Sequence, residues 1–304
     1  MNRSQRDVAL LLNPSAGKGH ALRWHGELTR RLTDSGCRVR SLVGRNAAES
    51  SALAAAAIAA GVEELVLVGG DGLVHQVLPH TVGTSVALGV IPVGTGNDLA
   101  RALSIPARDP LAAVDVVIGR HSRLVDVGRA GDTYFATVLA TGFDSRVSER
   151  AATVRWPHGQ LRYTAATLAE LRVFTPLTYR LGIDGNQREL DAMLVAVSNT
   201  PSYGGGLRIC PDAKIDDGRL DVVVIKPVSK LELVKVYPRL FTGTHVSHPA
   251  YERFGAHGVS LAAAGVVAYA DGERLGALPI GVEVVPSALR VFAPAPASRS
   301  ASSP

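Results

Sequence analysis

Two glycine-rich turns that each carry an aspartate are the strongest chemical signal in this 304-residue sequence. The first is Gly69-Gly70-Asp71-Gly72, and the second is Gly94-Thr95-Gly96-Asn97-Asp98. Glycines let backbone N–H groups approach a phosphate closely, and a helix that follows adds partial positive charge. A carboxylate beside that phosphate needs a Mg²⁺ ion or a transferable proton, so this pattern indicates phosphate chemistry. Each turn alone is equally well explained as a tight turn whose aspartate caps the next helix.

A third turn, Asn13-Pro14-Ser15-Ala16-Gly17-Lys18-Gly19, offers small residues and one cation to a phosphate. A Walker A loop would need a glycine five residues before Gly17 and a hydroxyl residue after Lys18. Leucine and glycine occupy those positions, so the P-loop NTPase class is excluded. A phosphate contact and an ordinary turn with a solvated lysine both remain open.

The second half of the chain contains two further acidic turns. Ala213 to Asp221 can offer carboxylates and backbone oxygens to a hard cation, although an Asp-Asp-Gly turn is usually only a turn. Tyr269 to Glu273 contains Asp-Gly, the commonest filler of a β-hairpin. Spacing alone favours a plain hairpin there.

The secondary-structure elements around these turns must position their side chains. The first 130 residues alternate apolar runs with amphipathic stretches. Strand followed by helix, repeated, predicts a Rossmann-like parallel sheet with helices on both faces, a three-layer α/β domain. Because the two Asp-bearing turns follow neighbouring strands, they share one crevice at the carboxyl edge, which favours a functional site. The expected strands are Val8–Leu12, Arg38–Val43, Leu65–Val68 and Val86–Val93, and the expected helices are Ala21–Thr33, Ala47–Ala60, Leu73–His80 and Leu99–Leu103.

From about Thr133 the pattern changes to β-rich runs with tight turns, which predicts an antiparallel β-sandwich. Helical insertions are expected at about Gln160–Phe174 and Lys230–Thr242. We therefore expect an α/β nucleotide-binding domain over 1–130, a β-rich lipid-binding domain over 131–287, and a disordered Ser/Pro/Ala-rich tail over 295–304. The expected strands are Tyr134–Ala140, Leu177–Ile183, Met193–Ser198, Leu220–Ile225, Val266–Tyr269 and Val282–Val285.

Composition narrows the classes of partner and compartment. A net charge of +5 favours anionic partners such as nucleotides or phospholipid headgroups. Nucleic acid is not an expected partner, because stacked aromatics and basic runs are lacking. Cys37 and Cys210 form no CxxC or Cys/His cluster, so we expect reduced cytoplasmic thiols. The N-terminus is polar, so we expect no signal peptide there. Glutamates interrupt the apolar stretch Ala52–Val68, so we expect no membrane span.

Taken together, the motifs resemble the bacterial diacylglycerol kinase family, soluble relatives of sphingosine and ceramide kinases. The glycine-Asp turn alone is shared with NAD kinases and phosphofructokinases, whereas all five motifs in this order are specific. The resemblance extends from about residue 8 to about residue 290. Its motifs are Asn13-Pro14 with Gly17-Lys18-Gly19, Gly69-Gly70-Asp71-Gly72, Gly94-Thr95-Gly96-Asn97-Asp98, Asp216-Asp217-Gly218 and Asp271-Gly272-Glu273.

The resemblance implies that ATP and lipid meet in a cleft between the two domains, and that a strand over 288–294 returns to the first domain. It implies that Glu273 is the general base, and that Asp71 and Asp98 lie near a catalytic Mg²⁺. It also implies a second, structural Mg²⁺, held by Lys214, Asp217 and Arg219, the first and last through their carbonyls. The nucleotide-binding residues that it implies are Asn13, Pro14, Ser15, Ala16, Gly17, Lys18, Gly69, Gly70, Gly72, Gln76, Gly94, Thr95, Gly96 and Asn97.

The resemblance therefore implies an ATP-dependent kinase that converts diacylglycerol to phosphatidic acid, in the cytoplasm and peripheral to the anionic inner membrane face. A homodimer is left open. The chain departs from the family pattern at Leu73, where threonine is usual, and at Gln76, where glutamate is usual, and both changes bear on nucleotide binding. The rival functions are a kinase of sphingoid bases, ceramide or NAD, and a nucleotide- or lipid-binding regulator without catalysis. A Rossmann oxidoreductase is not expected, because GxGxxG is missing from the first turn.

Overall fold

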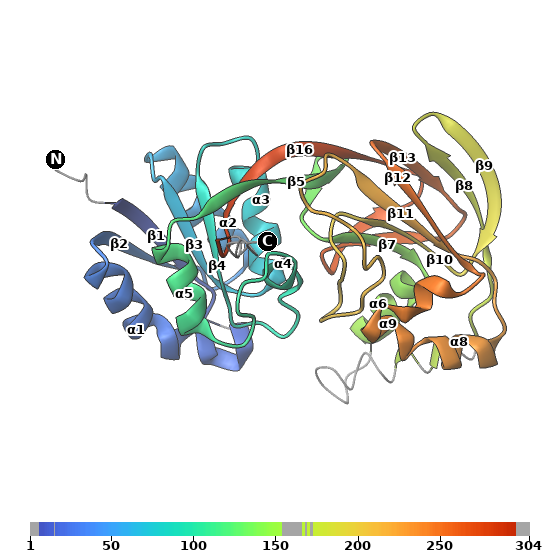
Figure 1. Cartoon of the computed structure of the whole chain (residues 1–304), viewed down its shortest axis with the longest axis horizontal. Helices are drawn as coiled ribbons and strands as arrows, with labels where there is room; N and C mark the ends of the chain where they lie inside the picture. Colours follow the sequence, from blue (N-terminus) through green and yellow to red (C-terminus); the bar gives the residue numbers. More distant parts are fainter. Residues whose placement is uncertain (1–5, 15, 154–165, 168, 171–172, 296–304) are drawn as a thin grey trace, which may run out of the picture.

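The computed structural model describes residues 6–14, 16–153, 166, 167, 169, 170 and 173–295, with only the backbone described at residues 17, 18 and 20. The chain folds into two domains side by side, shown in Figure 1 with the N-terminal half at the left. The expected tail after residue 295 and the first part of the helix expected at 160–174 lie outside the described residues, and residues 166, 167, 169, 170 and 173 are helical. No described helix has the length and apolar character that a bilayer crossing needs.

The N-terminal domain is built on four parallel strands in the order β2-β1-β3-β4. All residues of β3 and β4 are buried, as expected for strands with helices on both faces. Asn46 and Asp109 cap α2 and α5 by accepting backbone N–H groups. The elements are β1 (Arg6–Leu12), η1 (Ala16–Gly19), α1 (His20–Asp34), β2 (Cys37–Val43), α2 (Ala47–Ala59), β3 (Glu64–Gly69), α3 (Asp71–Thr81), β4 (Ala87–Pro92), α4 (Asp98–Ala102) and α5 (Pro110–Ile118).

The C-terminal domain is a sandwich of two sheets that enclose their own aliphatic core. One sheet has the antiparallel order β12-β11-β10-β7-β14-β15, and the other contains β16, β13, β8 and β9 together with β5 and β6. The elements that follow α5 along the chain, of which β5 leads from the first domain into the second, are β5 (Ser122–Ala130), β6 (Thr133–Phe135), β7 (Val138–Gly142), α6 (Phe143–Thr153), β8 (Leu177–Ile183), β9 (Asn186–Ala192), β10 (Leu194–Ser198), β11 (Leu220–Ile225), α8 (Lys230–Val236), α9 (Arg239–Thr242), η2 (Thr244–Ser247), β12 (Tyr251–Ala256), β13 (Gly258–Ala262), β14 (Val267–Ala270), β15 (Glu273–Ala277) and β16 (Ile280–Phe292).

The last strand joins the two domains. Figure 1 shows β16 running along the top of the molecule from one domain to the other. Its first residues pair with β13 in the sandwich, and Arg290 and Val291 pair in parallel with β4. The strand β5 lies antiparallel to it on the other side, so the N-terminal sheet is mixed rather than purely parallel. The predicted return of the chain is confirmed, but it is the second half of one strand and not a separate segment over 288–294.

Two predicted elements were wrong in detail. The single strand expected at Tyr134–Ala140 is two strands, β6 and β7, because Ala136 and Thr137 turn aside to donate their N–H groups to Asp271. The helix expected at Lys230–Thr242 is divided into α8 and α9 at Pro238, as a proline in a helix interior would require. Sequence reading also missed α5, α6, β5, β9, β12 and β13.

Candidate active site

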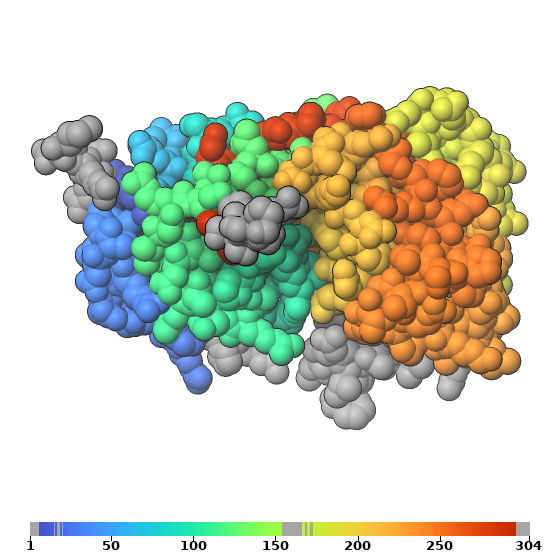
Figure 2. All heavy atoms as spheres, viewed as in Figure 1, coloured from blue at the N-terminus to red at the C-terminus, as the bar shows by residue number. Residues whose placement is uncertain are grey.

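A cavity of about 1150 Å³ lies between the two domains. The turns after β1, β3 and β4 line one side of it, and β7, α6, α8, α9 and the turn between β14 and β15 line the other. Gly205 of the sandwich donates its N–H to the Asp98 Oδ2 across this boundary, at 2.8 Å. Figure 2 shows the segments that contain these two residues, in gold and teal, meeting at the boundary between the domains.

The glycines of the two Asp-bearing turns allow their backbones to touch. A Cβ atom on Gly94 would lie 2.7 Å from the Gly70 Cα, so no larger residue fits there without a backbone shift. Asn97 fixes the second turn, because its side chain accepts from the Gly94 N–H at 3.1 Å and donates to the Gly94 carbonyl at 2.9 Å. The prediction that the two turns share a crevice is therefore confirmed.

Asp71 and Asp98 lie together at this edge of the sheet. The Asp71 Oδ1 accepts from the backbone N–H of Asp98 at 2.9 Å and of Leu99 at 3.3 Å. Burial, followed by the negative charge of Asp98, raises the pKa of Asp71 to about 6. Burial also raises the pKa of Asp98, whose Oδ1 has no hydrogen-bond partner among the described residues. Two crowded carboxylates with a free buried oxygen atom form a site that a divalent cation would stabilise.

The turn between β14 and β15 is a two-residue hairpin, so the hairpin interpretation of Tyr269 to Glu273 is confirmed. Both Asp271 and Gly272 have positive φ, of 51° and 86°, as a type I′ turn requires. The Asp271 carboxylate accepts hydrogen bonds from the Ala136 N–H, the Thr137 N–H and the Thr137 hydroxyl. Asp271 therefore anchors the hairpin to the start of β7 and is a positioning residue that sequence reading missed.

Glu273 follows this anchored turn and lies beside the first glycine turn. Its Oε1 is 3.7 Å from the point where a Cβ on Gly72 would lie. The neighbouring His75 lies 3.4 Å from the Asp271 Oδ2, and this contact raises the pKa of His75, with a smaller contribution from the charge of Glu273. Asp71 and Asp98 from the first domain and Asp271 from the second therefore line one end of the cavity. Glu273 is exposed and is not part of this lining, but it lies beside Gly72, which is.

The expected nucleotide-binding residues lie along the same edge, with some exceptions. Ser15 lies outside the described residues, and Gly17 and Lys18 belong to η1, which follows the turn after β1. Of the departures from the family pattern, Leu73 is buried and packs on Gly69, while the buried Gln76 Oε1 has no partner among the described residues. The expected residues that line the cavity are Asn13, Ala16, Gly70, Gly72, Gln76, Gly94, Thr95 and Gly96, whereas Pro14, Gly69 and Asn97 do not line it.

The residues expected to hold a second Mg²⁺ lie outside the cavity. Lys214, Asp217 and Arg219 are exposed, and the Asp217 Oδ1 accepts from the Arg219 N–H at 3.1 Å. The buried Asp126 orders this loop, since its carboxylate accepts from the N–H groups of Gly218 and of Ser287 in β16, each at 2.7 Å. Within the described residues, no group of three or more His, Cys, Asp or Glu side chains could hold a metal ion.

The far half of the cavity is apolar, and sequence reading did not identify its lining. Within it lies one acidic residue, Asp144 at the start of α6. Burial raises the pKa of Asp144 to about 7, and its Oδ2 has no partner among the described residues. A carboxylate cluster at one end and an aliphatic slot beside it suit a substrate with a polar head and a long apolar tail. The apolar side chains of this slot include Phe143, Val147, Met193, Leu194, Leu207, Ile209, Ile225, Leu233, Val236, Leu240 and Phe241.

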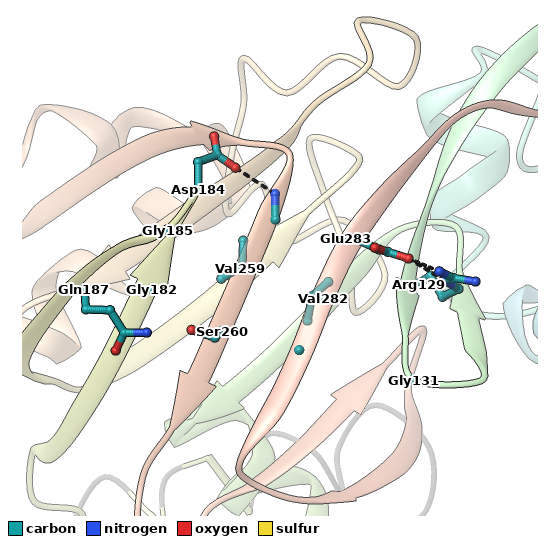
Figure 3. A pocket seen from close by; sticks show the side chains of 12 residues that line it. Arg129, Gly131, Gly182, Asp184, Gly185, Gln187, Val259, Ser260, Val282 and Glu283 are labelled. Carbon is teal, nitrogen blue, oxygen red and sulfur yellow. Dashed lines mark hydrogen bonds and ion pairs between the residues drawn. The ribbon is translucent and has the colours of Figure 1, made fainter.

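A second hollow, of about 480 Å³, lies on the outer face of the sandwich and is less suited to chemistry (Figure 3). Its charged groups already have partners: Arg129 pairs with Glu283, and the Asp184 Oδ1 accepts from the N–H groups of His257 and Gly258 at 2.8 Å. The inter-domain cavity is therefore the candidate active site.

Comparisons with known proteins match both halves of the chain. Residues 7–130 match the family model described as the diacylglycerol kinase catalytic domain, and residues 137–293 match the YegS C-terminal NAD kinase beta sandwich-like domain. A diacylglycerol kinase of Mycobacterium tuberculosis is 41% identical over 94% of this chain and 95% of its own length. A diacylglycerol kinase of Staphylococcus aureus is 29% identical over 95% and 93%.

Among solved structures, a diacylglycerol kinase from Bacillus anthracis has the same fold. Its TM-score against this chain is 0.77 at 22% sequence identity, and the match covers 97% of this chain and 99% of that one.

Proposed function

Because the chain belongs to the diacylglycerol kinase family, we propose that it transfers the γ-phosphoryl group of ATP to the primary hydroxyl of diacylglycerol, which yields phosphatidic acid. The observation that carries this proposal is the composition of one cavity: acidic side chains from both domains gather at one end, and aliphatic side chains line the other. We further propose that the boundary between the domains lies at residues 130 and 131, and that the enzyme works in the cytoplasm at the inner membrane face.

Glu273 is the general base of the proposed mechanism. Phosphoryl transfer needs an aligned hydroxyl, stabilised charge and acceptance of one proton. Glu273 is an exposed carboxylate beside Gly72, at the entrance to the turn that faces the phosphates. There it accepts the proton of the lipid hydroxyl, while the anchored Asp271 holds the hairpin in place.

In this proposal Asp71 and Asp98 would hold a catalytic Mg²⁺, and the Asp98 Oδ1, which has no hydrogen-bond partner among the described residues, supports the fit. When bound, Mg²⁺ would neutralise negative charge on the transferred phosphoryl group. The backbone N–H groups around Gly70, Gly72, Thr95 and Gly96 bind the phosphates in this proposal, and the first turn, from Asn13 to Lys18, contacts the nucleotide. Gln76 offers to the nucleotide its Oε1, which has no hydrogen-bond partner within the part of the chain that the structure describes.

In this proposal a second, structural Mg²⁺ would be held by the Asp217 carboxylate and by the backbone carbonyl oxygens of Lys214 and Arg219. The loop that contains them is tied by Asp126 to β16, so an ion here would stabilise the junction between the domains rather than the reacting groups.

A radioactive assay tests the proposed activity. Purified protein is incubated with [γ-³²P]ATP, Mg²⁺ and mixed micelles that contain diacylglycerol, ceramide, a sphingoid base or, in a separate reaction, NAD. The expected result is labelled phosphatidic acid and at most weak labelling of the other acceptors. Labelling of NAD or a sphingoid base alone would assign a different acceptor, and ATP binding without any product would identify a regulator without catalysis.

A further inference from the structure

The helices α8 and α9 carry apolar side chains on two opposite sides. Leu233, Val236 and Leu240 face inward and line the apolar half of the cavity. Leu231 and Val234, three residues apart on α8, are 77% and 53% exposed. A helix of a water-soluble protein normally turns one apolar stripe inward and a polar face outward, so apolar residues on both sides require a second apolar contact.

Two further exposed residues extend this apolar surface. Phe241 of α9 is 49% exposed and also lines the cavity, so it lies where the cavity meets the surface. Val173 is 61% exposed and precedes Phe174, which packs in the same cluster as Leu233. The exposed apolar side chains therefore lie on or next to the elements that line the apolar slot.

The charged groups around these residues favour an anionic partner. Lys235 is exposed beside Val234, and Arg208 is exposed next to the turn at Gly243 that ends α9. The acidic residue of α8, Glu232, is paired with His248 at 2.9 Å. Lysine and arginine side chains at the edge of an apolar patch reach phosphate groups while the apolar residues enter the acyl region.

We propose that Leu231, Val234 and Phe241 form a docking surface for an anionic phospholipid bilayer, with Lys235 and Arg208 at its edge. This inference rests on the proposed lipid kinase function and identifies the surface through which that substrate is taken up. Docking in this orientation places the open side of the slot against the leaflet. An acyl chain then passes from lipid to the aliphatic lining of the cavity without crossing water.

Vesicle sedimentation with the full chain tests the surface. The double variant Leu231→Glu/Val234→Glu is compared with wild type on vesicles of phosphatidylglycerol and phosphatidylcholine that contain long-chain diacylglycerol. Each lost apolar contact is expected to weaken partition about tenfold, so the double variant should bind at least about 100-fold more weakly. Leu124→Glu is the matched control, because Leu124 is 42% exposed on β5, away from α8 and α9. It should bind like wild type.

A second substrate separates docking from catalysis and folding. On dioctanoylglycerol, dispersed without vesicles, the double variant should keep wild-type turnover, and its thermal melt should match that of the control. Wild-type vesicle binding by the double variant would overturn the proposal. So would a wild-type dimer, measured by light scattering, that the two glutamates convert to a monomer without loss of vesicle binding. If wild type makes no phosphatidic acid from either substrate, the proposed function fails, while sedimentation still decides the docking surface.

Discussion

Replacement of Asp144 by asparagine tests how a buried carboxyl group in the apolar slot affects stability. Burial raises the pKa of Asp144 from 3.8 to about 7. Between those pH values the folded protein keeps a proton that the unfolded chain has lost, so stability falls as pH rises from about 4 to 7 and stays reduced above that. One pH unit corresponds to about 1.4 kcal/mol, which gives a loss of up to roughly 4 kcal/mol.

The assay is urea denaturation of wild type and Asp144→Asn at pH 5 and pH 8. Asparagine has nearly the shape of the protonated carboxyl group but cannot ionise, so the variant should be the more stable protein at pH 8. The difference between the two proteins in the free energy of unfolding should be smaller by half or more at pH 5. Asp132→Asn, at an exposed position, is the control and should show no such pH dependence. An Asp144→Asn protein that is no more stable than wild type at pH 8 would refute the reasoning.

Three further predictions concern the carboxylates and the glycine turns. Glu273→Gln should lower kcat by about 100-fold or more while the KM for ATP stays near that of wild type, measured with labelled ATP; unchanged turnover would remove this residue from the mechanism. Because Asp71 has a raised pKa of about 6 and Mg²⁺ binds the ionised carboxylate, the Mg²⁺ concentration for half-maximal activity should rise steeply below pH 6, and Asp71→Asn should be inactive at every pH. Gly94→Ala would place a Cβ 2.7 Å from the Gly70 Cα, so it should lower the free energy of unfolding by about 1–3 kcal/mol and weaken nucleotide binding. The control is Gly26→Ala in α1, which has open space around it and should leave the free energy of unfolding unchanged or raise it by up to about 1 kcal/mol. Thermal melts and ATP titrations measure both effects.

The parallel half of the fold could be predicted because its signals are local. The strands β3 and β4 are short runs of aliphatic residues that end in glycine turns, and a buried parallel strand needs nothing else. The same locality explains why Asp71 and Asp98 were recognised as partners: neighbouring strands place their following turns at one edge of the sheet.

The contacts between the domains could not be predicted from local patterns. The strand is interrupted between β6 and β7 because Asp271, more than 130 residues later in the sequence, accepts hydrogen bonds from two backbone N–H groups there. The position of Asp144 in an apolar slot likewise depends on helices from distant parts of the chain. By contrast, the division between α8 and α9 could have been found from Pro238 alone.

The strand β16 also limits how the two domains can move. Between Val285 and Leu289 its pairing with β5 is interrupted, and Ser287 there has a φ of 50° and donates its N–H to the buried Asp126. On either side of that interruption the strand is hydrogen-bonded into a sheet, to β13 in the sandwich and to β4 in the first domain. Two paired strands, β16 and β5, therefore connect the halves, and a hinge motion that brings ATP and the alcohol together is expected to centre on this interruption.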